Sequence, residues 1–589
     1  MTRMLARSSS RRRLAAGAVA LLSFAAAAPL RADVAIQITG LSNDEAGSAR
    51  ASLELAQYAM RDDVTPAQLR RLATRGEREI RRAMEPYGYY ETTVTSEISG
   101  DLPTFRVVFR VVRGERTLVR RADVRIEGPA TEVPVIRAAL DAFEPRVGEG
   151  LDHHLYEISK SEIGTLLSAW GFFDAELESH RVEVTRATRS AGIDLSWRSG
   201  QRYRIGAVRF DDAQLPQSFL RRYIPWQEGT DYSVEQLLAL QQRLVDADYF
   251  STVSVQPDLE ARADGVVPVD VLLVPAKRSI YTANAFVSTD LGPGGRLGFE
   301  RRWLNDGGHK LGIGLEHSGR LQSGTTFYRI PRPGRRNRSY NLSAGYRDEE
   351  TAADTRSRLS RVTANETLDD WGGYTRVLGL QYVNGDFTVA DEQRSSSLLF
   401  AEATLARKRA DDLLFPTQGV SIAYTTRFAL QGVLTDTSLA QLRADVKWVL
   451  PGTDVSRFIL RASAGVLQTG NFDALPPELR FFAGGDRSVR GFDYQAIGER
   501  NDRNGVVGGR YLAVASAEYE HYFWKEWGLS AFVDSGDAFN RRPEFNVGAG
   551  LGIRWRSPIG ILRLDFALPL RTDLADGGLR FHIVIGPDL

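Results

Sequence analysis

The second half of the chain carries its apolar side chains at every second position. In residues 547–555, Val, Ala, Leu, Ile and Trp alternate with glycine and arginine, and residues 562–568 and 580–586 follow a similar alternation. Successive side chains of a strand point to opposite faces of a sheet, so each strand has one apolar face and one polar or glycine-rich face. Repeated over residues 277–589, this pattern is typical of a barrel with a lipid-facing outer wall and a lumen.

The length and spacing of these segments indicate the size of the barrel. Residues 277–589 hold about sixteen strands, at roughly 20 residues for each strand with its connection. Short turns alternate with long polar loops, and in outer-membrane barrels the short turns face the periplasm. Six tryptophans beside short turns predict one interfacial girdle: Trp303, Trp371, Trp448, Trp524, Trp527 and Trp555. We therefore predict a 16-stranded antiparallel transmembrane β-barrel.

The averaged composition hides this membrane character. Mean hydropathy is −0.27, and after residue 32 no run of about 18 apolar residues appears, which argues against a helical span. A barrel wall places apolar residues only at alternate positions, so a slightly negative mean hydropathy is compatible with it. The sequence has no cysteine, which excludes disulfides, thiolate nucleophiles and cysteine-ligated metal sites.

Residues 1–32 have the pattern of a secretory signal peptide. Five arginines precede the apolar stretch 14–28, which is too short for a transmembrane helix and ends in small residues. Cleavage between Ala27 and Ala32 removes six arginines and no acidic residue, so the net charge of +1 becomes about −5. We therefore expect an acidic, exported protein, and no nucleic-acid partner.

Residues 33–276 contain a weak internal repeat. Aromatic residues follow a helical pattern and precede a strand at Tyr89, Phe172 and Tyr249, with spacings of 83 and 77 residues. This spacing predicts three small α+β domains, each with the order strand, two helices and strand pair. The three domains are expected at residues 33–116, 117–201 and 202–276, and the barrel at residues 277–589.

The aromatic residues of the repeat are predicted to be core residues. A ring at the junction of helix and strand fills the corner between a helical layer and a small sheet. A small mixed sheet of this kind also leaves one edge strand open, and an edge strand can pair with a visiting extended chain. The repeats are therefore candidate docking sites for extended segments.

Motifs for catalysis are missing from the sequence. No Gly-x-Ser-x-Gly, P-loop or His-Glu-x-x-His pattern occurs, and the seven histidines do not have metal-ligand spacing. The glycines of residues 548–552 belong to a strand face, so they are not a dinucleotide loop. We predict a protein that is not an enzyme, with no catalytic, cofactor or metal site.

The longest loop, about residues 468–508, contains the motif Val489, Arg490, Gly491 and Phe492 within Gly484–Phe492. With three small domains and a sixteen-stranded barrel, this motif resembles the outer-membrane assembly-factor superfamily that includes BamA, TamA and the two-partner secretion transporters. Three repeats and the stretches 532–538, 550–560 and 586–589 are most similar to the TamA family, the outer-membrane subunits of the translocation and assembly module. The resemblance covers essentially the whole chain after residue 32.

The resemblance implies that the small domains are POTRA domains and that the motif folds back into the lumen on the sixth loop. It also implies that acidic residues hold Arg490, and the matching positions are Glu518 and Asp534. Independently, an arginine in a lumen needs carboxylates because its guanidinium stays charged. Period two allows both acids to face the lumen. Whether Arg490 rigidifies a plug or takes part in gating stays open.

The resemblance further implies a protein that helps to fold and insert outer-membrane proteins, including autotransporters. Substrate strands would enter at a seam between the first and last barrel strands: Tyr281, Ala283 and Ala285 on one side, Phe581, Ile583 and Ile585 on the other. The implied location is the bacterial outer membrane, with the POTRA domains in the periplasm. The implied partners are outer-membrane lipid, unfolded outer-membrane proteins and a TamB-like periplasm-spanning inner-membrane protein. Alternatives are a two-partner-type secretion pore for one dedicated substrate and a passive channel.

Overall fold

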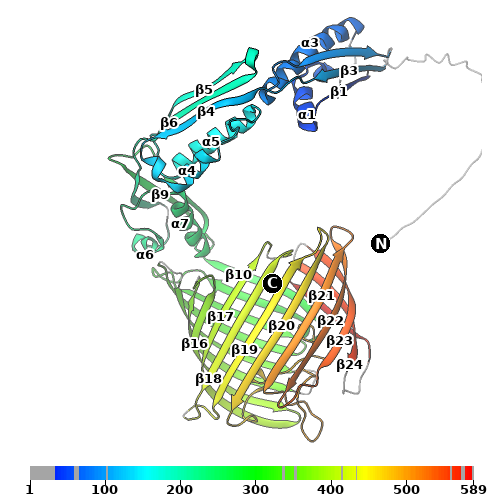
Figure 1. Ribbon diagram of the computed structural model, residues 1–589. Coiled ribbons are helices and arrows are strands. Elements are labelled where there is room, and N and C mark those ends of the chain that lie inside the picture. The colour runs from blue at the N-terminus through cyan, green and yellow to red at the C-terminus, as the bar shows by residue number, and fades with distance from the viewer. Residues whose placement is uncertain are drawn as a thin grey trace, which may run out of the picture. The chain divides into compact units, whose positions relative to one another are not determined.

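The computed structural model describes residues 33–58, 65–100, 104–211, 213–334, 338–350, 355–369, 371–412, 415–432, 434–557, 560–571 and 578–586 (Figure 1). The predicted signal segment, residues 1–32, lies outside the described residues. The chain divides into two compact units, one up to Tyr203 and one from Arg204 onward. Each unit is described by itself.

The first unit begins with a three-stranded sheet covered by helices. Its strand order is β1-β3-β2, with β1 parallel to the central β3. The Thr65 side chain caps the long helix by accepting a hydrogen bond from the backbone N–H of Gln68. Leu69, Ile80 and Met84 of that helix pack against the sheet. The elements are β1 (Asp33–Thr39), α1 (Asn43–Ser52), α2 (Glu54–Tyr58), α3 (Pro66–Met84), β2 (Thr93–Ser99) and β3 (Thr104–Val112).

A second sheet of the same design completes this unit. Its order is β4-β6-β5, and Asp152 caps the helix α5. Tyr90 of the preceding repeat packs against this second core, and its hydroxyl lies 3.0 Å from Nε2 of His153. The elements are β4 (Leu118–Glu127), α4 (Pro134–Asp141), α5 (His153–Ala169), β5 (Glu176–Thr185) and β6 (Ser190–Arg198).

The second unit opens with the third small sheet, ordered β7-β9-β8. Its elements are β7 (Arg204–Asp211), α6 (Gln217–Leu220), α7 (Val234–Asp246), β8 (Phe250–Pro257) and β9 (Val266–Pro275). Tyr249 and Phe172, the repeated aromatics, are each only 1% exposed. The Tyr249 hydroxyl also donates to the Gly308 carbonyl of a barrel turn, at 2.5 Å. Three mixed α+β domains before the barrel are thus confirmed.

The remainder of the second unit is a closed barrel of sixteen antiparallel strands, as predicted. Each strand pairs with its neighbours in chain order, and β10 meets β25 to close the circle. The strands are β10 (Ser279–Ser288), β11 (Gly292–Arg301), β12 (Lys310–Ser318), β13 (Leu321–Arg332), β14 (Arg338–Glu350), β15 (Arg356–Leu368), β16 (Thr375–Val389), β17 (Glu392–Ala410), β18 (Gly419–Ala429), β19 (Leu439–Pro451), β20 (Ser456–Thr469), β21 (Tyr511–Tyr522), β22 (Trp527–Phe539), β23 (Asn546–Ser557), β24 (Gly560–Arg571) and β25 (Arg580–Gly586).

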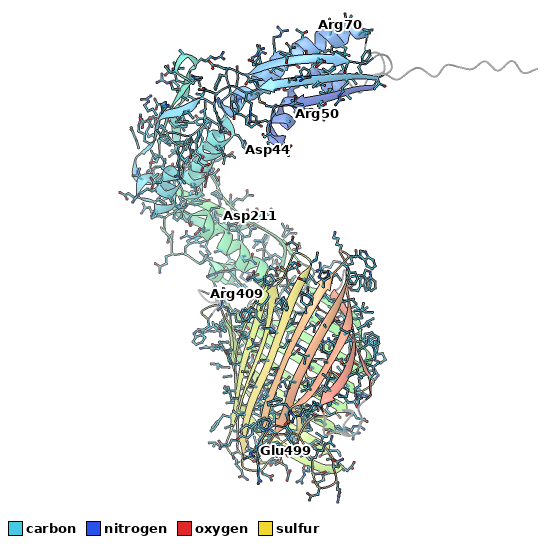
Figure 2. All side chains as sticks on the ribbon, turned by 45° about the vertical axis from the view of Figure 1, so that its right-hand side comes forward. Asp44, Arg50, Arg70, Asp211, Arg409 and Glu499 are labelled. Atoms are coloured by element: carbon cyan, nitrogen blue, oxygen red, sulfur yellow. The ribbon has the colours of Figure 1, made fainter. Side chains whose placement is uncertain are left out.

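The two faces of the wall differ as period two requires. On β22, Val533 is 47% exposed on the outer wall while its neighbour Asp534 is fully buried. The expected tryptophan girdle lies at one barrel end. Its residues lie beside the turns that join β11 to β12, β15 to β16, β19 to β20, β21 to β22 and β23 to β24. Figure 2 labels Arg409 of β17 at this end and Glu499 of the long loop at the other.

The long loop between β20 and β21, residues 470–510, fills much of the lumen. Its Leu479, Phe481 and Val489 form one buried apolar cluster with residues of the inner wall, such as Leu398 and Phe400 of β17. The lumen is therefore packed by the chain itself on this side, with polar contacts on the side of β21–β25. Among the described residues, no helix combines the length and apolar character needed to cross a bilayer.

Candidate functional site in the barrel lumen

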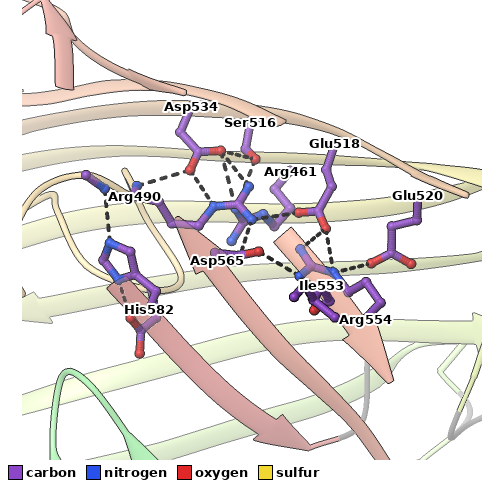
Figure 3. A network of polar contacts seen from close by, with 12 residues as sticks. Arg461, Arg490, Ser516, Glu518, Glu520, Asp534, Ile553, Arg554, Asp565 and His582 are labelled. Carbon is purple, nitrogen blue, oxygen red and sulfur yellow. Dashed lines mark hydrogen bonds and ion pairs between the residues drawn. The ribbon is translucent and has the colours of Figure 1, made fainter. Parts of the chain in front are cut away.

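The loop motif is buried inside the barrel. Val489 and Phe492 are 0% and 4% exposed and lie in the apolar cluster of the lumen. Arg490 lies between them in sequence and points instead toward β21, β22 and β24 (Figure 3). The apolar pair fixes the backbone of the loop, so the guanidinium is directed at the charged part of the wall.

Asp534 of β22 binds the motif arginine at three points. Its Oδ2 accepts from the backbone N–H of Arg490 at 3.0 Å and from Nε at 2.7 Å, while Oδ1 accepts from Nη2 at 3.0 Å. Ser516 donates a further hydrogen bond to Oδ1 at 2.6 Å. Charge-assisted bidentate contacts of this kind are the strong ones, and the additional backbone contact fixes the loop as well as the side chain.

Two further carboxylates and one ring complete the surroundings of Arg490. Its Nη1 donates to Glu518 of β21 at 2.8 Å and to Asp565 of β24 at 3.0 Å. The guanidinium carbon lies 3.4 Å from the ring centre of Phe532. Arg490 is 2% exposed, so a cation removed from water is compensated by three carboxylates and an aromatic face.

The network extends along the wall beyond Arg490. Arg554 of β23 donates to Glu518 at 2.5 Å, to Glu520 at 2.8 Å and to Asp565 at 2.6 Å. Arg457 binds Glu520 at 2.6 Å, and Arg461 lies 3.5 Å from Asp534. Among these eight residues, four carboxylates thus face four guanidinium groups. Such a balanced set avoids an uncompensated buried charge.

Sequence reasoning named Glu518 and Asp534 for this site, and the structure places both against Arg490 (Figure 3). It did not name Asp565, Glu520 or Arg554. The alternation pattern contains a signal for them, because each is a charged residue at a strand position that faces away from lipid. Charged residues on that face of the strands near the motif are the pattern that would have found them.

The glycine face of β23 leaves room for the motif. A Cβ at Gly548 would lie 1.9 Å from the Arg490 carbonyl oxygen, and one at Gly552 would lie 2.0 Å from Oδ1 of Asp565. Gly491 has φ 95°, a left-handed conformation that favours glycine, and its Cβ position faces the backbone of Leu568 at 3.2 Å. The loop therefore lies directly against β23 and β24.

A second polar group connects the same loop to both strands of the barrel seam. The Asp486 carboxylate accepts from Ser288 Oγ at 3.1 Å and Thr289 Oγ1 at 2.7 Å, and it lies 2.6 Å from Nδ1 of His582. Asp290 accepts from the Asp486 backbone N–H at 3.1 Å. Burial and the neighbouring Asp486 carboxylate raise the pKa of Asp290 to about 7. Although burial raises it, hydrogen bonds from His582 and Thr289 hold the pKa of Asp486 below its ordinary value.

Asp290, Asp486 and His582 are close enough to offer three ligands to a metal ion. The backbone N–H of Gly491 donates to Nε2 of His582 at 3.1 Å, however. A nitrogen that accepts cannot carry the ring proton, so the proton of the neutral imidazole is on Nδ1 and points at Asp486. No lone pair of the ring is left for a cation in this arrangement, and the group is a hydrogen-bonded cluster.

The predicted seam residues lie on the outer wall without meeting across the seam. Tyr281 is 78% exposed, and its ring lies tilted against that of Phe299 of β11 with ring centres 5.3 Å apart; the ring of Phe581 lies tilted against that of Phe566 of β24 at the same distance. Tyr281, Ala283, Leu297 and Phe299 line a groove of about 370 Å³ on the lipid-facing side. Among the described residues, β10 and β25 pair only at Ser288 and Val584.

At the short-turn end of the lumen, one aromatic ring is held between two arginines. The ring centre of Phe415, in the turn between β17 and β18, lies 4.0 Å from the guanidinium carbon of Arg457 and 3.4 Å from that of Arg556. Arg457 also donates to the Pro416 carbonyl at 2.5 Å. Because Arg457 binds Glu520, this turn is joined to the network that holds Arg490.

Comparison with known proteins supports this fold. Residues 35–113 match the first POTRA domain of TamA, and residues 203–274 match a POTRA family described as a surface antigen variable number repeat. A BamA structure from Haemophilus ducreyi that lacks POTRA domains 1–3 covers 80% of this chain and 99% of its own, at 17% identity and a TM-score of 0.66. At this identity the likeness establishes the fold.

Curated relatives match shorter segments. The outer membrane protein assembly factor BamA of Nitratidesulfovibrio vulgaris is 36% identical over 114 residues, 18% of this chain and 14% of that protein. Outer envelope protein 80 of the Arabidopsis thaliana chloroplast is 34% identical over 137 residues, 22% of this chain and 17% of that protein. The chain thus spans less than a fifth of the length of either relative.

A family model described as the Omp85 superfamily domain matches residues 282–588. This segment is more than half of the chain and contains nearly all of the barrel, the long loop and its motif. The protein therefore belongs to the Omp85 superfamily of outer-membrane β-barrel proteins, with its POTRA domains in the periplasm.

Proposed function

We propose that this protein folds and inserts other outer-membrane proteins, autotransporters among them, at the seam between β10 and β25. The observation that carries the proposal is the weak pairing of these two strands. Among the described residues they pair at one position, Ser288 with Val584, whereas β24 and β25 pair at seven. A barrel that is otherwise fully laddered has one edge at which a new strand can be added.

The edge of β10 offers unused backbone groups to such a strand. Residues 279–287 of β10 ladder with β11 on one side and have no described ladder partner on β25. In lipid, each backbone N–H or C=O group without a hydrogen-bond partner costs on the order of several kcal/mol. A substrate strand that pairs with β10 would satisfy these groups while it leaves water for the bilayer.

The small domains supply further edges on the periplasmic side. Each three-stranded sheet has an edge strand that follows the helices along the chain and precedes the central strand. These edge strands are β2, β5 and β8. We infer that these edges receive extended segments of unfolded outer-membrane proteins. The match of residues 35–113 to the first POTRA domain of TamA supports a TamA-type role, with a TamB-like periplasm-spanning protein as the inner-membrane partner.

The alternative of a secretion pore receives less support from the lumen. Passage through the barrel requires the loop of residues 470–510 to leave, and this loop is held by a buried apolar cluster and by the contacts of Arg490. The proposal includes no enzymatic step. Its driving force is the folding and membrane partitioning of the substrate.

The absence of native cysteine permits a direct test. Val287→Cys and Ile585→Cys place thiols one position beyond the Ser288–Val584 pair, so oxidation locks the seam. The variant is reconstituted in lipid vesicles, and the yield of folded autotransporter barrel is measured by heat-shifted gel mobility. We expect oxidation to stop assembly and reduction to restore it, with each single-cysteine variant unaffected by either treatment.

The same locked barrel distinguishes the alternatives. Secretion through the lumen does not need the seam, so a dedicated substrate would still be exported by the oxidised protein. If autotransporter assembly continues at the same rate in the locked state, the seam is not the site of insertion and the proposal fails.

A further inference from the structure

A single carboxylate receives hydrogen bonds from both sides of the seam. From the side of the first strand, Ser288 and Thr289 donate to Asp486 at 3.1 and 2.7 Å. From the last strand, Nδ1–H of His582 donates to the same carboxylate at 2.6 Å. Asp486 and His582 are 8% and 5% exposed, so water competes little for these bonds. The loop thus connects two strand ends that pair with each other at one position.

The imidazole is fixed from its other side by the loop motif. The backbone N–H of Gly491 donates to Nε2 of His582 at 3.1 Å. With a donor at Nδ1 and an acceptor at Nε2, both ring nitrogens are used by the loop of residues 470–510, at Asp486 and at Gly491. A further ion pair between Arg580 and Asp493 joins the same strand to the same loop. The loop therefore holds the β10 side of β25, while β24 pairs with its other side at seven positions.

The loop itself cannot move independently of the wall. Gly491 follows Arg490, whose guanidinium contacts carboxylates of β21, β22 and β24. A Cβ on Gly548 of β23 would already overlap the Arg490 carbonyl, so the loop has no free space on that side. The contacts at the seam are thereby attached to the rigid part of the barrel.

We propose that Asp486 and His582 are positioning residues that form a latch, in which the loop, rather than a strand ladder, holds the seam closed. The proposal rests on the proposed function only in treating the seam as the working site. In the latched state, His582 is neutral with its proton on Nδ1, and Asp486 is ionised. Releasing the latch frees the ends of β10 and β25 while the remaining fifteen strand pairings stay intact.

The latch is tested on the full-length protein alone, in vesicles without substrate. The readout is the rate of disulfide formation between cysteines at positions 287 and 585, which reports how much of the time the seam is closed. His582→Phe keeps a ring but removes both hydrogen bonds, and Asp486→Asn removes the charge that collects the three donors. We expect each change to slow the disulfide formation at least about fivefold, because the loss of one ordinary hydrogen bond already shifts an equilibrium by that factor.

Conservative variants separate positioning from bulk packing. The amide of a glutamine at position 582 has an NH2 group that donates and a carbonyl oxygen that accepts, so His582→Gln is expected to restore the rate to within about twofold of the parent. His521→Phe, an exposed histidine at the short-turn end of β21, is the matched control and should leave the rate unchanged. Heat-shifted gel mobility reports whether each variant has folded.

Two results would overturn the latch. One is an unchanged crosslinking rate in folded His582→Phe and Asp486→Asn, and the other is an equal loss in His582→Gln and His582→Phe. If His582→Phe does not fold, Ser288→Ala with Thr289→Val removes the two hydroxyl donors to Asp486 on the first-strand side. The same pair also removes the Ser288 oxygen that accepts from the Asp290 backbone N–H at 3.1 Å, and it must likewise slow the crosslinking. Because no substrate is present, failure of the assembly function leaves this readout unaffected.

Discussion

One oxygen of Asp534 accepts hydrogen bonds from both the backbone and the side chain of Arg490, at 3.0 and 2.7 Å. Asp534→Asn removes the negative charge and leaves a buried guanidinium with fewer acceptors. We expect the free energy of unfolding to fall by about 2 to 4 kcal/mol, between the loss for an unsatisfied buried hydrogen-bonding group and that for a broken buried ion pair. Urea unfolding in lipid, followed by heat-shifted mobility, measures the loss.

Asp502→Asn provides the control for Asp534→Asn, because Asp502 is an exposed residue of the same loop. A surface change of this kind should alter the free energy of unfolding by less than about 0.5 kcal/mol. Equal effects of the two changes would contradict a special role for the Asp534 contacts.

Gly548→Ala tests the close approach of loop and wall. The added Cβ would lie 1.9 Å from the Arg490 carbonyl oxygen, so the loop must move away from β23. We expect a loss of about 1 to 3 kcal/mol, as for other overpacked sites, and faster protease cleavage within residues 484–492. Gly314→Ala on β12, where no atom lies within 4 Å, should leave both measurements unchanged. If protease cleaves residues 484–492 of Gly548→Ala no faster than those of the parent protein, the close approach of loop and wall is contradicted.

The fold could be predicted because its patterns are repetitive. Period two over residues 277–589 and the repeated aromatics at Tyr89, Phe172 and Tyr249 are properties of single strands and single domains, which sequence records directly. The sixteen strands and the three mixed sheets follow from counting them. The single described pairing of β10 with β25 depends on strand register around the whole barrel, which no local pattern specifies.

The site could be predicted only where a motif indicated it. Arg490 and the acids Glu518 and Asp534 came from the motif and from the resemblance. His582 and Asp486 are 96 residues apart and meet only because the loop folds into the lumen against the last strand. A histidine with no metal-ligand spacing gave no reason to examine it, although its place on the non-lipid face of β25 is visible in the alternation.

Asp290 makes the loop contact dependent on pH. Its pKa is raised to about 7 by burial and by the Asp486 carboxylate, with His582 facing the same pair. Between pH of about 4 and 7 the folded protein therefore holds a proton that the unfolded chain has lost, so stability falls as pH rises through this window. We expect a higher midpoint of thermal unfolding at pH 6 than at pH 8.

Asp290→Asn checks this assignment, because an amide stays neutral at every pH. The difference between the midpoints at pH 6 and pH 8 should shrink in this variant, and the midpoint at pH 8 should rise toward the value at pH 6. A variant that keeps the full pH dependence of the parent would show that another group is responsible.

Phe415→Ala tests whether the turn between β17 and β18 closes the short-turn end of the lumen. The ring contacts Arg457 and Arg556, with guanidinium carbons 4.0 and 3.4 Å from its centre, and each such contact is worth about 1 kcal/mol or more. Without it, we expect the arginines to be hydrated and the barrel to conduct more ions, measured as single-channel current in a planar bilayer. Phe428→Ala removes a ring that is 55% exposed on the outer wall and should leave the current unchanged. If Phe415→Ala conducts no more than the parent, the turn does not close the lumen, and the loop of residues 470–510 is the barrier by itself.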